Sequence, residues 1–134
     1  ENLIKQLGVG EDYIQVLLEL KSKEALKLQD KFPTSLKLRG ASKNLIKDKR
    51  VIIVDDGIAT GASGICAAIF AKNQKSKEII LATPVITKDT LNSIKTYFDM
   101  TISLDIKDNL VSVSQFYKSF PQVTDEEALK TIAS

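Results

Sequence analysis

The sequence predicts an α/β fold, with an open, mostly parallel sheet and flanking helices. Short apolar runs alternate with helical patterns along the second half of the chain, which is typical of right-handed βαβ units. The run Val51 to Val54 is β-branched throughout and bounded by charged residues, as in a central parallel strand. A length of 134 residues suits one domain with its own core, so we expect residues 1–134 to form a single domain.

The first half of the chain is predicted to hold a long helix and a connector. Apolar residues recur at helical spacing from Glu11 to about Asp30. They are Ile14, Leu17, Leu18, Ala25 and Leu28. Pro33 interrupts this pattern, and mixed polar residues continue to Lys49, with a short extended piece expected at "SLKLRG".

The second half is predicted to alternate between helices and strands. In chain order we expect a helix from Thr60 to about Lys72, a strand over Ile79–Val85, a helix over Lys88–Tyr97, a strand over Met100–Leu104 and a fourth, short strand near Leu110–Val113. The segment "VTDEEALKTI" has a capping-box pattern, with Thr124 as the N-cap and Glu127 three residues later, and predicts a last helix.

Composition excludes several kinds of chemistry. The chain has no histidine, which removes histidine-based nucleophilic catalysis and most transition-metal sites. Its one cysteine, Cys66, cannot form an intrachain disulfide, and its apolar neighbours predict a core position. No apolar run is long enough for a membrane span, so we expect no membrane partner, and the single cysteine favours a reducing, cytoplasmic setting.

Positive charge is concentrated in the connector from Lys31 to Arg50. Such a segment attracts anions when it closes over a ligand, and it is equally typical of a solvated loop. Few aromatic residues interleave with it, so we expect no nucleic acid as a partner.

The stretch "VIIVDDGIATGAS", residues 51–63, carries the main functional signal. Asp55 and Asp56 follow a strand directly, and ligands of open parallel sheets bind beyond the carboxyl ends of the strands. The loop after them leads into a helix whose first amides lack partners, which makes an anion site. Two carboxylates that accept hydrogen bonds from hydroxyls therefore stand beside amides that donate to a phosphate, as a sugar phosphate requires.

Three other motifs do not fit this stretch. No lysine follows Gly61, as a Walker loop would require, and the glycine spacing is not that of a dinucleotide fingerprint. A response-regulator receiver also begins with a strand ending in two acids. However, too few residues follow Asp105, the candidate phosphoacceptor, to complete that fold.

The same stretch resembles the PRPP-binding motif of type I phosphoribosyltransferases, where PRPP is phosphoribosyl pyrophosphate. Four apolar residues, two acids and a short loop ending in Thr-Gly-x-Ser coincide in order. The segments "LGVGEDYIQVLLEL" and "FYKSFPQVTDEE" are similar to segments of bacterial and archaeal phosphoribosyltransferases whose base is unassigned.

This resemblance implies a type I phosphoribosyltransferase-like fold and a role for each residue of the motif. Asp55 and Asp56 would bind the ribose hydroxyls and favour an oxocarbenium-like transition state. The 5-phosphate would be held by the loop residues Ala59, Thr60, Gly61, Ala62 and Ser63. Mg²⁺ would be bound mainly through PRPP, and the reaction would be attack by a nitrogen base with release of pyrophosphate. The family also implies a homodimer with a nucleobase as the second substrate.

The sequence also departs from the family. We find no upstream loop that would bind pyrophosphate, and the first residue is Glu1, so we expect an N-terminally incomplete domain. "FYKSFPQ" is the candidate for the hood over the base, and Phe116, Tyr117 and Phe120 would either stack on that base or pack in the core. The alternative to an enzyme is a regulatory module of the same fold that senses PRPP or a nucleotide without catalysis.

Overall fold

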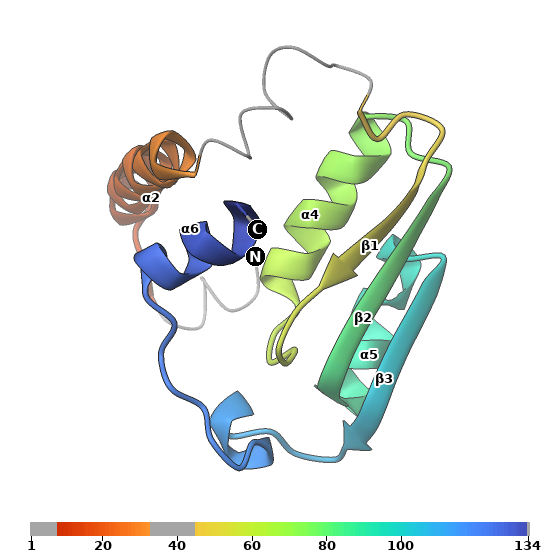
Figure 1. Cartoon of the computed structure of the whole chain (residues 1–134). Helices are drawn as coiled ribbons and strands as arrows, with labels where there is room; N and C mark the ends of the chain where they lie inside the picture. Colours follow the sequence, from red (N-terminus) through yellow and green to blue (C-terminus); the bar gives the residue numbers. More distant parts are fainter. Residues whose placement is uncertain (1–7, 33–44, 134) are drawn as a thin grey trace. The chain divides into compact units, whose positions relative to one another are not determined.

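The computed structural model describes residues 8–32 and 45–133 (Figure 1). These residues group into two compact units, of which one is formed by the described part of residues 43–125 and the other by the described N-terminal part with the C-terminal helix. The basic residues Lys37, Arg39 and Lys43 and the expected extended piece "SLKLRG" lie outside the described residues.

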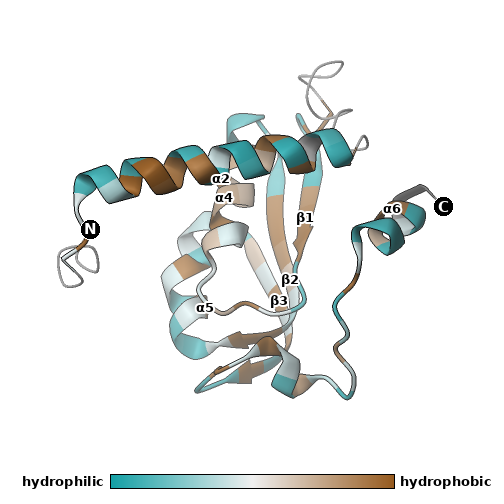
Figure 2. Ribbon diagram, turned by 90° about the vertical axis from the view of Figure 1, so that its left-hand side faces the viewer, coloured by the Kyte–Doolittle hydropathy of each residue, from teal (hydrophilic) through white to brown (hydrophobic). Residues whose placement is uncertain are grey.

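The N-terminal part contains helix α2, Glu11–Lys31. Gly10 precedes its first turn, Glu11 and Asp12 stand at the N-terminal end, and Lys31 at the C-terminal end, so the charges complement the helix dipole. Figure 2 shows apolar and polar residues alternating along it. The C-terminal helix α6 spans Asp125–Ala133. Both expected helices are confirmed.

The larger unit is built on a sheet of parallel strands. The described residues form a three-stranded sheet in the order β1-β2-β3, with β1 at Arg50–Val54, β2 at Glu78–Thr87 and β3 at Met100–Lys107. The register pairs Ile52 with Ile80 and Ala82 with Ile102. The predicted parallel α/β sheet is therefore confirmed. In the described part β2 is the central strand and β1 lies at an edge, which corrects the expected central position of Val51–Val54.

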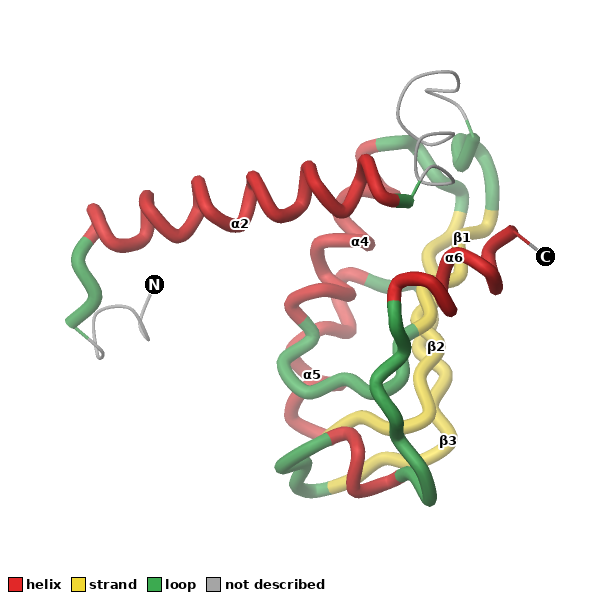
Figure 3. The backbone as a smooth tube through the Cα atoms, turned by 60° about the vertical axis from the view of Figure 1, so that its left-hand side comes forward, coloured by secondary structure: helices red, strands yellow, loops and turns green. Residues whose placement is uncertain are grey.

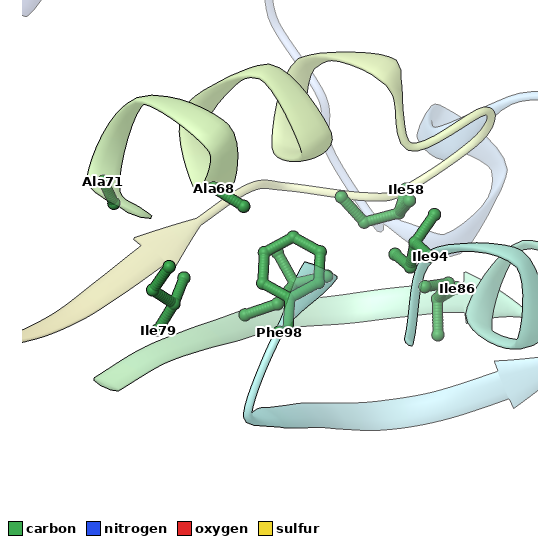
Figure 4. Packing of buried hydrophobic residues seen from close by; sticks show 8 residues of the cluster. Ile58, Ala68, Ala71, Ile79, Ile86, Ile94 and Phe98 are labelled. Carbon is green, nitrogen blue, oxygen red and sulfur yellow. The ribbon is translucent and has the colours of Figure 1, made fainter. Parts of the chain in front are cut away.

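Helices pack on one face of this sheet (Figure 3). In chain order, helix α4, Ala62–Asn73, connects β1 to β2. The connection from β2 to β3 consists of helix α5, Lys88–Ile94, and the 3-10 turn η1, Lys95–Tyr97. Their side chains meet those of β2 in a single cluster, part of which Figure 4 shows in close-up. It contains Ile58, Ala68, Ala71, Ile79, Leu81, Ile86, Ile94 and Phe98.

Two expectations for single segments are wrong. The expected strand near Leu110–Val113 is a loop that leads into the 3-10 turn η2, Val113–Phe116, because Val111 is 92% exposed and pairs with no described strand. Cys66 is exposed rather than buried. Gly64, Ala68 and Ala71 form the buried face of α4 at helical spacing, and Cys66 lies off that face.

Among the described residues, no helix combines the length and the apolar composition that a membrane crossing requires.

Candidate functional site

A pocket of about 240 Å³ lies where β1 ends and α4 begins. The residues that line it are consecutive in the chain, except that Asp56 is not among them. The lining residues are Asp55, Gly57, Ile58, Ala59, Thr60, Gly61, Ala62, Ser63 and Gly64. All the site residues expected from the sequence are therefore brought to this pocket, except that Asp56 stands beside its wall.

The loop between Asp55 and Gly61 is tied to the neighbouring strand. The amide of Asp55 donates to Ala82 O at 3.2 Å, and the amide of Ile58 donates to Val85 O at 2.9 Å. Ile58 is 2% exposed and lies with Ile86 and Ile94 at one end of the hydrophobic cluster (Figure 4). An apolar anchor in the middle of the motif thus holds the polar residues on either side at the pocket.

Gly61 makes the turn from the loop into α4. Its φ of 77° is in the left-handed region, and a Cβ at this position would lie 2.6 Å from Cγ2 of the buried Ile94. Only glycine avoids both the backbone strain and the overlap.

Two threonines at the start of α5 support the loop, and sequence reasoning missed them. The Thr87 hydroxyl donates to Thr90 Oγ1 at 2.9 Å, and the Thr90 hydroxyl donates to Ala59 O at 2.7 Å. Thr87 also caps α5 by accepting from the Thr90 amide at 3.1 Å. The N-cap pattern was readable in "TKDT", but its contact with Ala59 depends on the fold.

Among the described residues, two amides at the start of α4 are free to bind an anion. The amide of Ala62 donates to Thr60 Oγ1 at a long 3.4 Å. Within the described ranges, the amides of Gly61 and Ser63 have no acceptor. Unpartnered amides at a helix N-terminus, together with the helix dipole, favour phosphate or carboxylate.

The two carboxylates have different environments. Asp55 is half-buried, whereas Asp56 is exposed. Burial raises the pKa of Asp55, and the negative charge of Asp56 raises it further, while hydrogen bonds from the amides of Asp56 and Gly57 act in the opposite direction. A ligand that donates hydrogen bonds or carries positive charge would relieve this unfavourable pair.

The segment after β3 reaches the backbone of Asp56. Tyr117 Oη donates to the backbone oxygen of Asp56 at 2.6 Å, and its ring lies 4.9 Å from that of Phe120. Phe116 instead lies under the ammonium group of Lys107, at 5.5 Å. Phe120 is 43% exposed, so the three aromatic residues do not all lie in the core.

The described end of the basic connector lies away from this pocket. Lys49 and Arg50 are at the N-terminal end of β1, whereas Asp55 follows its C-terminal end. The guanidinium group of Arg50 pairs with the carboxylate of Glu78 across the strands. These residues therefore contribute to the sheet and not to the pocket.

Comparisons with known proteins find similarity over most of this chain. A family model described as phosphoribosyl transferase domain matches residues 2–119. Two Mycobacterium tuberculosis proteins, from different strains and each named "Putative phosphoribosyl transferase", are 31% identical over 91 residues. That alignment covers 68% of this chain and 20% of each relative.

A solved structure shows the same fold. The crystal structure of TT1426 from Thermus thermophilus superposes with a TM-score of 0.63 at 25% identity. The match covers 81% of this chain and 47% of that one. The chain thus spans less than half the length of the relatives that it matches.

Proposed function

Because this chain belongs to the phosphoribosyl transferase domain family, we propose that its pocket binds PRPP for transfer of the phosphoribosyl group to a nitrogen base, with release of pyrophosphate. The observation that carries the proposal is the position of the Asp55 carboxylate and the unpartnered α4 amides around one pocket. Its 240 Å³ is below the roughly 300–1,000 Å³ of sites for drug-sized ligands, which suits the sugar-phosphate half of PRPP.

The proposed binding mode assigns each side of the pocket to one part of the substrate. The carboxylates of Asp55 and Asp56 accept hydrogen bonds from the ribose hydroxyls, and the amides and hydroxyls of residues 59–63 hold the 5-phosphate. As the bond from C1 to pyrophosphate breaks, positive charge develops on the ribose ring, and two nearby negative charges stabilise it. Catalysis then rests on positioning and electrostatics, which needs no protein nucleophile.

Magnesium fits the donor set of this site when the substrate supplies most of the ligands. The carboxylates of Asp55 and Asp56 are the hard oxygen donors that Mg²⁺ prefers. Among the described residues, no group of three acidic, cysteine or histidine side chains stands ready to hold a metal alone. When bound, Mg²⁺ would neutralise the charge of the departing pyrophosphate.

The identity of the second substrate and of any protein partner extends the proposal. A nucleobase or a related nitrogen base is the proposed acceptor, and a second copy of the chain is the proposed partner. Both rest on the resemblance to the family, whereas a cytoplasmic location is proposed from the single cysteine of the chain.

The proposal is tested by a panel of purine, pyrimidine and related bases incubated with PRPP, Mg²⁺ and the full-length protein. Base-dependent release of pyrophosphate is the expected result. Binding of PRPP without turnover on any base would instead support a sensor of PRPP, and a protein that does not bind PRPP would contradict both functions.

The raised pKa of Asp55 predicts that the ionised carboxyl lowers the stability of the fold while it favours binding of PRPP. Between the ordinary aspartate pKa and the raised one, the folded protein binds more protons than the unfolded chain, so stability falls as pH rises. We expect Asp55→Asn to melt at a higher temperature than the wild type at neutral pH and to lose this advantage in acid.

Thermal melting across a pH series measures the difference. Asp48→Asn makes the same chemical change at the other end of β1 and serves as the control. A lower melting temperature of Asp55→Asn at neutral pH would contradict the prediction. PRPP binding by the wild type should weaken as the pH falls through the raised pKa, because a protonated carboxyl accepts fewer hydrogen bonds.

A further inference from the structure

The peptide unit between Asp56 and Gly57 is held by residues that lie far away in the sequence. Its carbonyl oxygen accepts a hydrogen bond from the Tyr117 hydroxyl at 2.6 Å. Tyr117 follows the 3-10 turn η2, whose first residue, Val113, packs against Gly57 of the same peptide unit. Two side chains of one short segment therefore meet the backbone of the acidic turn.

The contact with Val113 is close. A Cβ on Gly57 would lie 2.5 Å from Val113 Cγ1 and 2.7 Å from Val113 Cγ2. The valine methyl groups thus occupy the space that a side chain at position 57 would need. Gly57 is required here for close approach, since its φ is not in the left-handed region.

The two ends of this peptide unit have different neighbours. A peptide is planar, so the direction of the Asp56 carbonyl also sets the direction of the Gly57 amide. The Gly57 amide lowers the pKa of the neighbouring Asp55 carboxyl, because it faces the ionised form of that group. Tyr117 therefore restrains a plane whose amide end acts on Asp55, and rotation of this plane would change the backbone at Asp56 as well as the position of that amide.

The tyrosine is itself restrained. Its ring contacts that of Phe120 at 4.9 Å between centroids, with the planes tilted by 43°. This arrangement leaves the hydroxyl directed at Asp56 O, and the aromatic contact limits the rotamers that compete with it.

We propose that Tyr117 is a positioning residue, which orients the carboxylates of Asp55 and Asp56 toward a ribose diol by fixing the peptide unit between Asp56 and Gly57. The inference rests on the proposed function, because the diol is the ligand that it concerns. It separates two parts of the site: Tyr117 acts on the sugar end, whereas the amides of residues 59–63 bind phosphate independently of it.

The test compares ligands that differ at the sugar end. Isothermal titration calorimetry on the full-length protein measures the affinity for ribose 5-phosphate, 2-deoxyribose 5-phosphate and inorganic phosphate. We expect the wild type to prefer ribose 5-phosphate over its 2-deoxy analogue. In Tyr117→Phe this preference should fall by roughly threefold to tenfold, as expected for one lost hydrogen bond, while the affinity for inorganic phosphate stays unchanged.

Two further variants make the outcome decisive. Tyr97→Phe removes the hydroxyl of a partly exposed tyrosine in η1 and should leave all three affinities unchanged. Val113→Ala loosens the other contact with the peptide unit, and it should lower the sugar preference in the same direction, which keeps the test available if Tyr117→Phe fails to fold.

The failures of the two proposals differ. If the wild type does not distinguish the two sugars, the proposed binding of the diol is wrong. If the wild type distinguishes them and Tyr117→Phe and Val113→Ala keep the full preference, the positioning role is overturned. Equal loss of affinity for all three ligands would also overturn it, because it would indicate a general loosening of the site.

Discussion

Replacement of both Asp55 and Asp56 by asparagine is expected to slow base-dependent pyrophosphate release by about a thousandfold or more. This is the size of effect that the loss of preorganised electrostatic contacts with a transition state has in other enzymes. Asparagine keeps the size of the side chain and removes the negative charge that stabilises the positive charge developing on the ribose. The rate of pyrophosphate release with saturating PRPP, Mg²⁺ and the best base of the panel measures the effect.

The single variants and a control locate the effect. Each single replacement should retain part of the rate, since one carboxylate remains beside the ribose. Asp48→Asn removes the same charge at the N-terminal end of β1 and should keep the full rate. A double variant with wild-type turnover would show that these carboxylates take no part in the reaction.

Gly61→Ala is expected to destabilise the fold by about 2–4 kcal/mol and to lower the affinity for inorganic phosphate by about tenfold or more. The left-handed φ of 77° is strained for alanine, and the new methyl group would lie 2.6 Å from Ile94 Cγ2. The strain is relieved only if the loop shifts, which moves the amides that face the anion. Urea unfolding and phosphate titration measure the two effects.

Gly64→Ala is the matched control for this prediction. Gly64 is in the first turn of α4, and a Cβ there would make ordinary contacts, 3.6 Å from Phe98 and 3.9 Å from Leu81. Alanine also favours the helix by up to about 1 kcal/mol relative to glycine, so this variant should be at least as stable as the wild type. The prediction for Gly61 is wrong if both variants behave alike.

Local patterns were sufficient for most elements of the fold. The expected strand at Ile79–Val85 lies inside β2, and the expected helix at Glu11–Asp30 ends within one residue of α2. Periodicity is a reliable signal here because a buried face imposes it over many residues. The short run Leu110–Val113 had no such length, and its last residue, Val113, packs against Gly57 instead of pairing with a strand.

Local patterns did not predict whether a strand is central or lies at an edge of the sheet. Val51–Val54 is as apolar as a central strand, yet Val54 is 74% exposed at the edge of the described sheet. An apolar run indicates that a strand is suited to burial, and only its neighbours decide whether it is buried. The exposed position of Cys66 has the same cause, since apolar neighbours in sequence do not select the face of a helix that meets the core.

The sequence by itself determined the pocket, because its lining is contiguous. A strand, a loop and a helix that follow one another within residues 51–64 have few ways to fold, and their order alone places a carboxylate beside helix N-terminal amides. The tertiary structure alone decided how that pocket is held. Thr90 is 31 residues from Ala59 and Tyr117 is 61 residues from Asp56, so their contacts exist only once the sheet has brought these segments together.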